Sequence, residues 1–318
     1  MVHSGFPLPQ PRVEGVFSSP SQRGFIALAL ASVIWGGMYV ASDALMHQIP
    51  PFVALELREA VAAIILISIA ARRGLLKVDR ADRLSFVGVG IIGFTTSIGF
   101  QFSGTHDAGA GLGSLVTASS PVLIAVLGVV VLKERVPPVR WVAIAVALAG
   151  VVVVLGTPAG GPRAAKGVML LLVAMVAWSV YTIWSRRLLD RYHALTVVAV
   201  ASGVGAITSL PLAIVAGDRS ATPLPTTLLG WGEVGYIGIF GMVVAYFLWV
   251  SGFKHVDASR GAVMLLFQPL TGVLLSAAIL GEPISAGTMM GGILISLGVI
   301  GAILAGSNQA RQEAASPT

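Results

Sequence analysis

Two stretches of the chain repeat each other, and this repeat restricts the fold more than any other feature of the sequence. Pro121 and Pro269 are 148 residues apart, and so are Glu134 and Glu282. In each copy, an apolar segment that contains the proline ends in a short turn that carries the glutamate, and a second apolar segment follows. A repeat of this length predicts a fold that is built from two similar units.

The repeated segments are long, apolar and almost free of charge. Charged residues make up 11% of the chain, whereas a soluble domain has about 25%. Continuous apolar runs of about 20 residues are typical of transmembrane helices, since barrel strands are about half as long and alternate in character. Many of the 38 glycines lie inside these runs, including Gly150 and Gly298, which keep the 148-residue offset. Small residues there let helices approach closely. The sequence therefore predicts an all-α integral membrane protein.

Ten transmembrane helices are predicted from the apolar runs, at residues 24–46, 51–71, 84–104, 108–132, 138–156, 167–188, 194–216, 230–252, 258–280 and 284–305. The basic residues predict their orientation. With the N-terminus in the cytoplasm, 16 of the 20 Lys and Arg fall in cytoplasmic segments, 3 fall in outer loops and Arg58 falls within a helix. Because cytoplasmic loops carry the excess of Lys and Arg, we expect a multi-pass protein of the bacterial cytoplasmic (inner) membrane with both termini inside.

Each half contains five predicted helices, and an odd number makes the two halves cross the membrane in opposite senses. Glu134 is then expected at the cytoplasmic side and Glu282 at the outer side. Inverted repeats are common in secondary transporters, where the substrate site lies near the midplane between the halves, so we expect a central cavity. The predicted units are a disordered cytoplasmic extension, not a cleaved signal peptide, at 1–23, five-helix repeats at 24–157 and 167–306, and a cytoplasmic tail at 307–318.

Two tryptophans lie near the middle of their predicted helices. Trp35 and Trp178 are each about eleven residues from a helix end, which is roughly 16 Å at 1.5 Å per residue. Tyr39 and Tyr181 share their helix faces, and Tyr246 is a further candidate. We expect these aromatic side chains to line the cavity, with helix packing as the alternative. The remaining tryptophans lie near helix ends, as in the interfacial belt: Trp141, Trp184, Trp231 and Trp249.

Three charged residues, Glu56, Arg58 and Glu59, lie within the second predicted helix. Ionisable groups inside a membrane are costly and usually face a bundle interior or a wet cavity. We therefore treat all three as candidates for substrate binding or ion coupling. The alternatives are a cluster that reaches water at the outer end and a structural ion pair with another helix.

The repeated prolines and glutamates have different expected roles. Pro121 and Pro269 each remove a helix hydrogen bond, and the freed carbonyl can line a cavity or simply kink a packed helix. Glu134 and Glu282 are expected to cap helices or lock the halves together, because a carboxylate is stabilised at a helix N-terminus; gating is the alternative. Polar residues near the prolines or near a helix end are further cavity candidates: Gln101, Ser119, Ser120 and Gln268. For Gln101, the alternative is a hydrogen bond on the loop side.

Other kinds of site are not indicated. The chain has no cysteine, and its histidines lack metal-ligand spacing. The glycines from Gly109 to Gly113 are not followed by the Lys-Ser/Thr of a phosphate loop. We therefore expect no metal or cofactor. The basic residues sit in short loops between helices, which argues against nucleic acid as a partner.

The ordered set of these motifs resembles the drug/metabolite transporter superfamily in its ten-span form with two EamA-type domains, over about residues 24 to 306. The resemblance implies a pseudo-two-fold bundle around a central cavity and transport, commonly export, of small metabolites such as amino acids. It also implies that the helices with Trp35 and Trp178 border the cavity, and that Arg58 could hold a substrate carboxylate. The motifs that carry it are Trp35-Gly36, Leu57-Arg58, Pro121, Leu132 to Arg135, Trp178 to Arg187, Pro269 and Leu280 to Pro283.

The predicted function is a secondary transporter, not an enzyme, that exports small metabolites, with amino acids or related amphipathic compounds as the preferred substrates, by alternating access. Export of drug-like or cationic compounds is the alternative, followed by a channel and a membrane-embedded enzyme. A proton bound at Glu56 or Glu59 is a candidate coupling ion, with uncoupled facilitated diffusion as the alternative. Monomer and homodimer both remain open.

Overall fold

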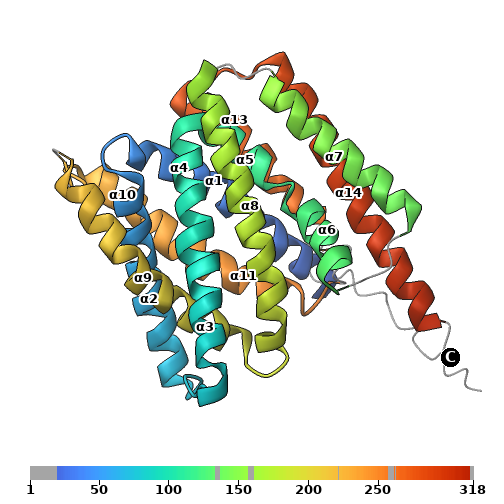
Figure 1. Cartoon of the computed structure of the whole chain (residues 1–318), viewed down its shortest axis with the longest axis horizontal. Helices are drawn as coiled ribbons and strands as arrows, with labels where there is room; N and C mark the ends of the chain where they lie inside the picture. Colours follow the sequence, from blue (N-terminus) through green and yellow to red (C-terminus); the bar gives the residue numbers. More distant parts are fainter. Residues whose placement is uncertain are drawn as a thin grey trace, which may run out of the picture.

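A computed structural model describes residues 20–132, 137–156, 161–220, 222–256, 261 and 263–315. The described residues form a bundle of helices without strands (Figure 1). Glu134 lies outside them, so its predicted role is not addressed by the structure. In the N-terminal half, the helices are α1 (Pro20–Met46), α2 (Pro51–Arg72), η1 (Arg80–Asp82), α3 (Arg83–Gly90), η2 (Ile91–Ser97), α4 (Ile98–Ala108), α5 (Ala110–Thr117), α6 (Ser120–Leu132) and α7 (Pro138–Gly156).

The C-terminal half follows a similar order of long and interrupted helices. Its elements are α8 (Gly161–Leu189), α9 (Ala194–Asp218), α10 (Leu228–Gly235), η3 (Tyr236–Val244), α11 (Ala245–Gly252), η4 (Val263–Leu266), α13 (Phe267–Leu275), η5 (Ser276–Leu280) and α14 (Ala286–Ala315). The first and the last helix extend beyond the boundaries that the sequence predicted. Helix α1 begins at Pro20 inside the expected N-terminal extension, and α14 continues to Ala315 through most of the expected tail.

Among the described residues, 7 helices are long and apolar enough to cross a membrane, and shorter apolar helices cover Ala110–Ile124 and Trp141–Val154. Helix α2 has a comparable length, but Glu56, Arg58 and Glu59 lie within it. The chain is therefore a multi-pass membrane protein, and three charged residues lie well inside its membrane-length helix α2.

Several of the predicted helices are interrupted. The third contains a π-helical segment, η2, and the eighth contains another, η3. The fourth is split into α5 and α6 by a turn at Ala118 and Ser119. Interruptions free backbone groups and are tolerated in membranes only where protein or a cavity satisfies those groups. In this chain they occur beside the central cavity described below.

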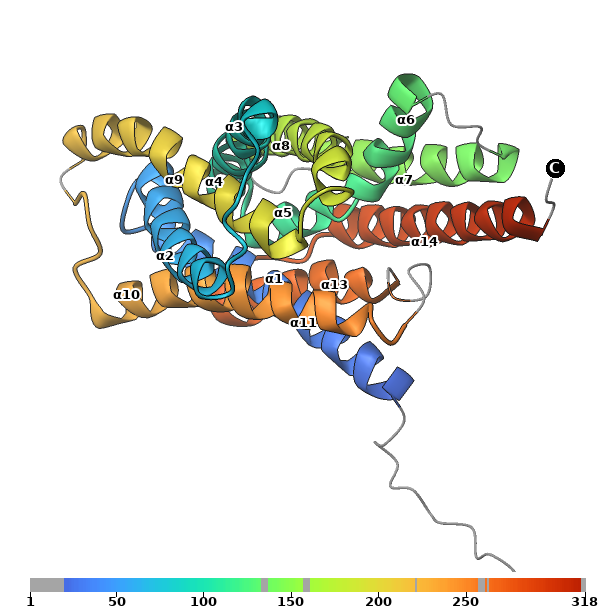
Figure 2. The ribbon, with the colours of Figure 1, turned by 90° about the horizontal axis from the view of Figure 1, so that it is seen from below.

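Helices from the two halves pair closely. Helix α7 runs along α14, a pairing that is plain in Figures 1 and 2, and α2 packs on α9. Glycine permits the first contact. A Cβ at Gly150 would lie 2.7 Å from the carbonyl oxygen of Gly291, and one at Gly298 would lie 2.6 Å from that of Ala143. Small residues thus bring the two helix backbones together, as is usual inside membranes.

Candidate functional site

A cavity of about 380 Å³ lies between the two halves, a size that suits a small metabolite. Most of its wall is apolar or aromatic, and both halves contribute to it. The wall is formed by Trp35, Met38, Tyr39, Arg58, Phe94, Ser97, Ile98, Gln101, Thr117, Ala118, Ser120, Pro121, Ile124, Ala174, Met175, Trp178, Tyr181, Val198, Gly241, Met242, Tyr246, Trp249, Leu265 and Gln268.

Aromatic pairs line two sides of this cavity. The rings of Trp35 and Trp249 have centroids 5.1 Å apart, and those of Trp178 and Tyr181 are 4.7 Å apart. The indole N–H of Trp35 donates to the carbonyl of Gly241 at 2.9 Å, at the π-helical segment η3. This bond fixes the indole ring of α1 against the other half of the chain. Two rigid aromatic faces therefore enclose the space between them.

Tyr39 links three helices through polar contacts in the cavity wall. Its hydroxyl lies 2.5 Å from Oγ1 of Thr117 on α5, and the amide of Gln268 on α13 donates to it at 3.5 Å. These groups form a polar strip beside the aromatic faces. A bound molecule with both apolar and polar parts could contact both.

Arg58 is the one charged side chain in the cavity wall described here, and it is only 3% exposed. Its guanidinium forms an ion pair with Glu59, whose carboxylate also accepts a hydrogen bond from Ser202 on α9 at 3.1 Å. The guanidinium carbon lies 5.8 Å from the ring centroid of Phe102. Within the described residues, Nε of Arg58 has no hydrogen-bond partner. A buried cation thus retains a free donor for an anionic group.

The two glutamates of α2 turn away from the cavity. Glu56 accepts a hydrogen bond from Ser209 at 2.7 Å, and Glu59 is held by Arg58 and Ser202. Neither carboxylate is part of the cavity wall. The reason is helix geometry, since residues three apart share a face and that face packs on α9.

The repeated prolines begin helices instead of kinking them. Pro121 lies in the first turn of α6, directly after the break between α5 and α6. In a continuous helix, the backbone N–H of residue 121 would donate to the carbonyl of Thr117, but proline has no N–H. The hydroxyl of Ser120 donates to that carbonyl instead, at 2.5 Å. Pro269 lies in the first turn of α13 and is buried outside the cavity wall. Proline is tolerated near a helix start because its missing N–H has no helical partner there.

The structure therefore places some of the predicted cavity residues in the wall and others outside it. Three lie outside its wall, namely Glu56, Glu59 and Ser119, whose hydroxyl donates to the carbonyl of Val116 at 2.6 Å. Trp249, which was expected in the interfacial belt, also lies in the cavity wall. The sequence feature that could have placed Trp249 in the wall is its three-residue spacing from Tyr246, because residues three apart share a helix face. The predicted residues in the wall are Trp35, Tyr39, Arg58, Gln101, Ser120, Pro121, Trp178, Tyr181, Tyr246 and Gln268.

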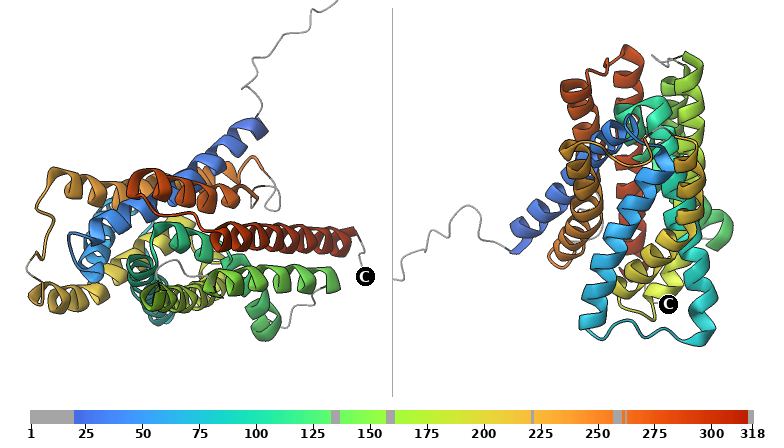
Figure 3. Two further views of the ribbon diagram at one scale, coloured as in Figure 1. Left: turned by 90° about the horizontal axis from the view of Figure 1, so that it is seen from above. Right: turned by 90° about the vertical axis from the view of Figure 1, so that its left-hand side faces the viewer.

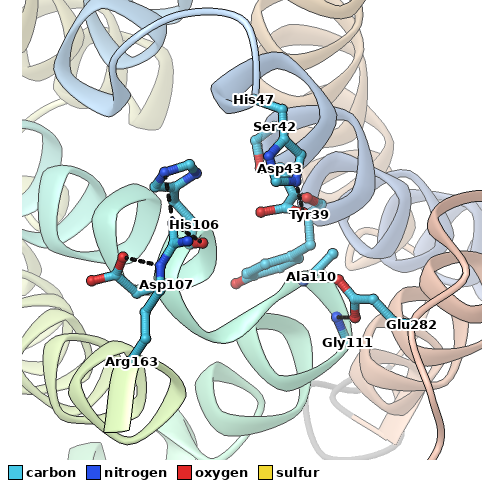
Figure 4. A network of polar contacts seen from close by, with 10 residues as sticks. All are labelled: Tyr39, Ser42, Asp43, His47, His106, Asp107, Ala110, Gly111, Arg163 and Glu282. Carbon is cyan, nitrogen blue, oxygen red and sulfur yellow. Dashed lines mark hydrogen bonds and ion pairs between the residues drawn. The ribbon is translucent and has the colours of Figure 1, made fainter. Parts of the chain in front are cut away.

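Glu282 binds a helix N-terminus, but not that of the helix that follows it. Its two carboxylate oxygens accept hydrogen bonds from the backbone N–H groups of Ala110, at 2.7 Å, and Gly111, at 2.9 Å, at the start of α5 (Figure 4). The preceding Gly109 has a φ of 94°, and a Cβ there would lie 2.8 Å from the same carboxylate. Glu282 thus joins the C-terminal half to the N-terminal half.

Further polar contacts surround this cap. Arg163 at the start of α8 forms an ion pair with Asp107 at the end of α4, at 3.1 Å (Figure 4), and Lys166 pairs with the same carboxylate at 2.9 Å. Arg163 also lies 3.1 Å from Nε2 of His106. Asp43 is buried nearby and pairs with His47 at 3.5 Å. No group of three or more potential metal ligands occurs in the part of the chain that the structure describes.

Known proteins share this architecture. The model of the EamA-like transporter family matches residues 22–156 and again residues 165–304. An uncharacterized transporter of Bacillus subtilis, YetK, is 26% identical, with 89% of each chain covered. A probable amino-acid metabolite efflux pump of Salmonella typhimurium is 28% identical, covering 87% of this chain and 93% of its own. One solved crystal structure, 25% identical, has a TM-score of 0.64 and covers 88% of this chain and 96% of its own. The two family matches span most of the sequence, and the chain belongs to the EamA-like transporter family.

Proposed function

We propose that this protein is a secondary transporter that exports amino acids or closely related metabolites. The observation that carries the proposal is a buried guanidinium, that of Arg58, in the wall of a cavity whose other lining residues are uncharged and mostly aromatic or apolar. Arginine binds carboxylates with charge-assisted hydrogen bonds, and the aromatic faces suit an apolar side chain. The relative described as a probable amino-acid metabolite efflux pump supports this substrate class.

Charge balance favours a zwitterion over a cation. The pair formed by Arg58 and Glu59 has no net charge, and an amino acid brings none. Its carboxylate would bind the guanidinium, while its ammonium group would lie against the ring faces of Trp35 or Trp178, which attract cations. A cationic drug would instead bring a second positive charge close to Arg58 without a neutralising partner in the cavity wall. Glu59 and Ser202 act as positioning residues for the guanidinium.

The transport cycle that we propose is alternating access between two inverted halves, residues 24–157 and 167–306. Two reciprocal contacts support this symmetry. The approach of Gly150 to Gly291 is repeated by Gly298 and Ala143, with the same 148-residue offset and the helices exchanged. A two-fold relation predicts such reciprocal contacts. The π-helical segments η2 and η3 also occupy corresponding places in the two halves.

The helix ends that the cavity wall reaches support one direction of opening. Val198, Trp249 and Leu265 extend its wall toward the end of the bundle where the basic pair Arg186 and Arg187 lies. The positive-inside rule assigns that end to the cytoplasm. The contacts of Glu282 with α5 and of Arg163 with Asp107 join the two halves (Figure 4), and Arg163 lies at the end of α8 opposite to Arg186 and Arg187. We therefore infer an inward-open state in a cytoplasmic membrane, and export would require the contacts of Glu282 and Asp107 to separate.

A thermal-shift series on the purified protein tests the substrate class. Phenylalanine would be compared with phenylpropionate, which lacks the amino group, and with phenethylamine, which lacks the carboxylate. We expect phenylalanine and phenylpropionate, which both carry a carboxylate, to raise Tm, because a ligand that binds only the folded state stabilises it. Phenethylamine should leave Tm unchanged. An equal shift with the amine would favour the cationic alternative. Leucine and its matched analogues extend the test to aliphatic substrates.

A further inference from the structure

A second hollow, of about 660 Å³, lies on the outside of the bundle at the basic end. Helices α2 and α3 form its sides, α9 forms its floor, and the segment between α2 and α3 borders it. Figure 3, right, shows this segment joining the two helices at the bottom of the bundle. The hollow is lined by Ile67, Leu76, Lys77, Val78, Asp79, Arg83, Val200, Gly203, Val204 and Ile207.

The floor of the hollow is apolar and open toward the lipid. Val200, Val204 and Ile207 follow one face of α9, and Ile207 is 73% exposed. Gly203 leaves space between them, since a Cβ there would meet only the Cδ1 atom of Ile67, at 3.0 Å. In a membrane this face contacts hydrocarbon, so an acyl chain can lie along it.

The mouth of the hollow carries unneutralised positive charge. Lys77 and Arg83 are exposed, and in the described part of the chain neither forms an ion pair. Both nearby carboxylates pair with Arg191, Asp79 at 3.1 Å and Asp82 at 2.5 Å, so Lys77, Arg83 and this trio together keep a net positive charge. Two free cations therefore stand where an apolar groove meets the predicted cytoplasmic membrane surface.

We propose that this hollow binds an anionic phospholipid, with the phosphate at Lys77 and Arg83 and one acyl chain along α9 beside Gly203. Basic pockets at the cytoplasmic ends of membrane helices attract anionic headgroups. A zwitterionic lipid has the same chains but carries its own ammonium group, so it gains less from the two cations. A soluble phosphate would use the cations and leave the groove empty. The site is independent of the proposed substrate and its cavity.

Native mass spectrometry of the full chain in detergent, titrated with phosphatidylglycerol and with phosphatidylcholine of the same acyl chains, tests this site. We expect phosphatidylglycerol to bind at least fivefold more tightly. The double variant Lys77→Gln/Arg83→Gln should weaken phosphatidylglycerol binding about 25-fold, because each basic residue near an anionic lipid contributes about fivefold. The matched control is Arg80→Gln, an exposed cation of the same segment outside the hollow, and it should bind as the parent does. Gly203→Leu, which fills the groove, should weaken both lipids.

Equal binding of the two lipids by the parent protein would overturn the proposal. So would a double variant that binds phosphatidylglycerol as tightly as Arg80→Gln does, or competition by glycerol phosphate at the same concentration as the lipid. If the double variant does not elute as a folded monodisperse protein, the single variants Lys77→Gln and Arg83→Gln give the same comparison, with about fivefold expected for each.

Discussion

Arg58 and Glu59 are neighbours on α2 whose side chains form a buried ion pair at the wall of the central cavity. The pair has two separable roles. It neutralises two charges inside a membrane protein, and it holds the guanidinium where a substrate carboxylate would bind. Variants of the two residues can distinguish these roles because stability and transport are measured independently.

Removing Arg58 alone should destabilise the protein and stop transport. The variant Arg58→Gln leaves Glu59 buried without its cation, a change that costs about 3–5 kcal/mol at buried pairs. The double variant Arg58→Gln/Glu59→Gln should recover most of this loss in a thermal unfolding assay and should still fail to transport. Recovery of transport together with stability would mean that Arg58 has only a structural role.

The aromatic wall should matter more than aromatic residues at the membrane surface. Trp178→Ala removes one side of the cavity, whereas Trp141→Ala changes a side chain that is 44% exposed on α7. We expect transport to fall at least tenfold for Trp178→Ala, since stacked or edge-on aromatic contacts and burial together contribute about 2 kcal/mol. Transport by Trp141→Ala should match the parent at equal expression. Equal losses in the two variants would argue against the cavity assignment.

Glu282 should stabilise the contact between the two halves. In Glu282→Ala, two N–H groups at the start of α5 lose their acceptor, a loss of about 2 kcal/mol. We expect a lower Tm than for Asp218→Ala, which changes an exposed carboxylate at the same end of the bundle. An unchanged Tm in Glu282→Ala would mean that water or another residue replaces the cap without cost.

The glycine contact between α7 and α14 should be sensitive to a single methyl group. Gly150→Ala would bring a Cβ to 2.7 Å from the Gly291 carbonyl oxygen, and the helices must separate to admit it. Overpacking of this kind costs about 1–3 kcal/mol. Gly156→Ala on the same helix meets no atom within 4 Å and is the matched control. A lower Tm is expected for Gly150→Ala only. If the two variants had the same Tm, the helices would have room for the added methyl group.

The sequence was sufficient to predict the family, the helical membrane class and most helix positions, because apolar length is a local signal and the repeat and its motifs can be read directly from the sequence. The placement of Trp35 and Trp178 in the cavity wall agrees with their depth, although their contact with substrate remains a prediction. The partner of Glu282 could not be predicted. Its carboxylate caps a helix that is 171 residues away at Gly111, and nothing near Glu282 in the sequence specifies that helix.

Other features also depended on the packing of distant segments. Pro121 marked an interruption, but only the structure shows that the helix breaks before it and restarts. Glu59 was grouped with Arg58 as a candidate substrate contact, yet it faces Ser202 on α9, since the face of α2 that it shares with Glu56 packs there. Trp249 lies near a helix end in the sequence, and its ring contact with Trp35 depends on how α1 crosses α11.

Counterflow of labelled amino acid in proteoliposomes tests the central claim most directly. Vesicles loaded with unlabelled phenylalanine or leucine should accumulate the labelled compound transiently, since a carrier exchanges substrate across the membrane. The folded double variant Arg58→Gln/Glu59→Gln should show no such overshoot. The account would be contradicted if the parent protein showed no counterflow across a panel of amino acids, or if the double variant exchanged them as fast as the parent.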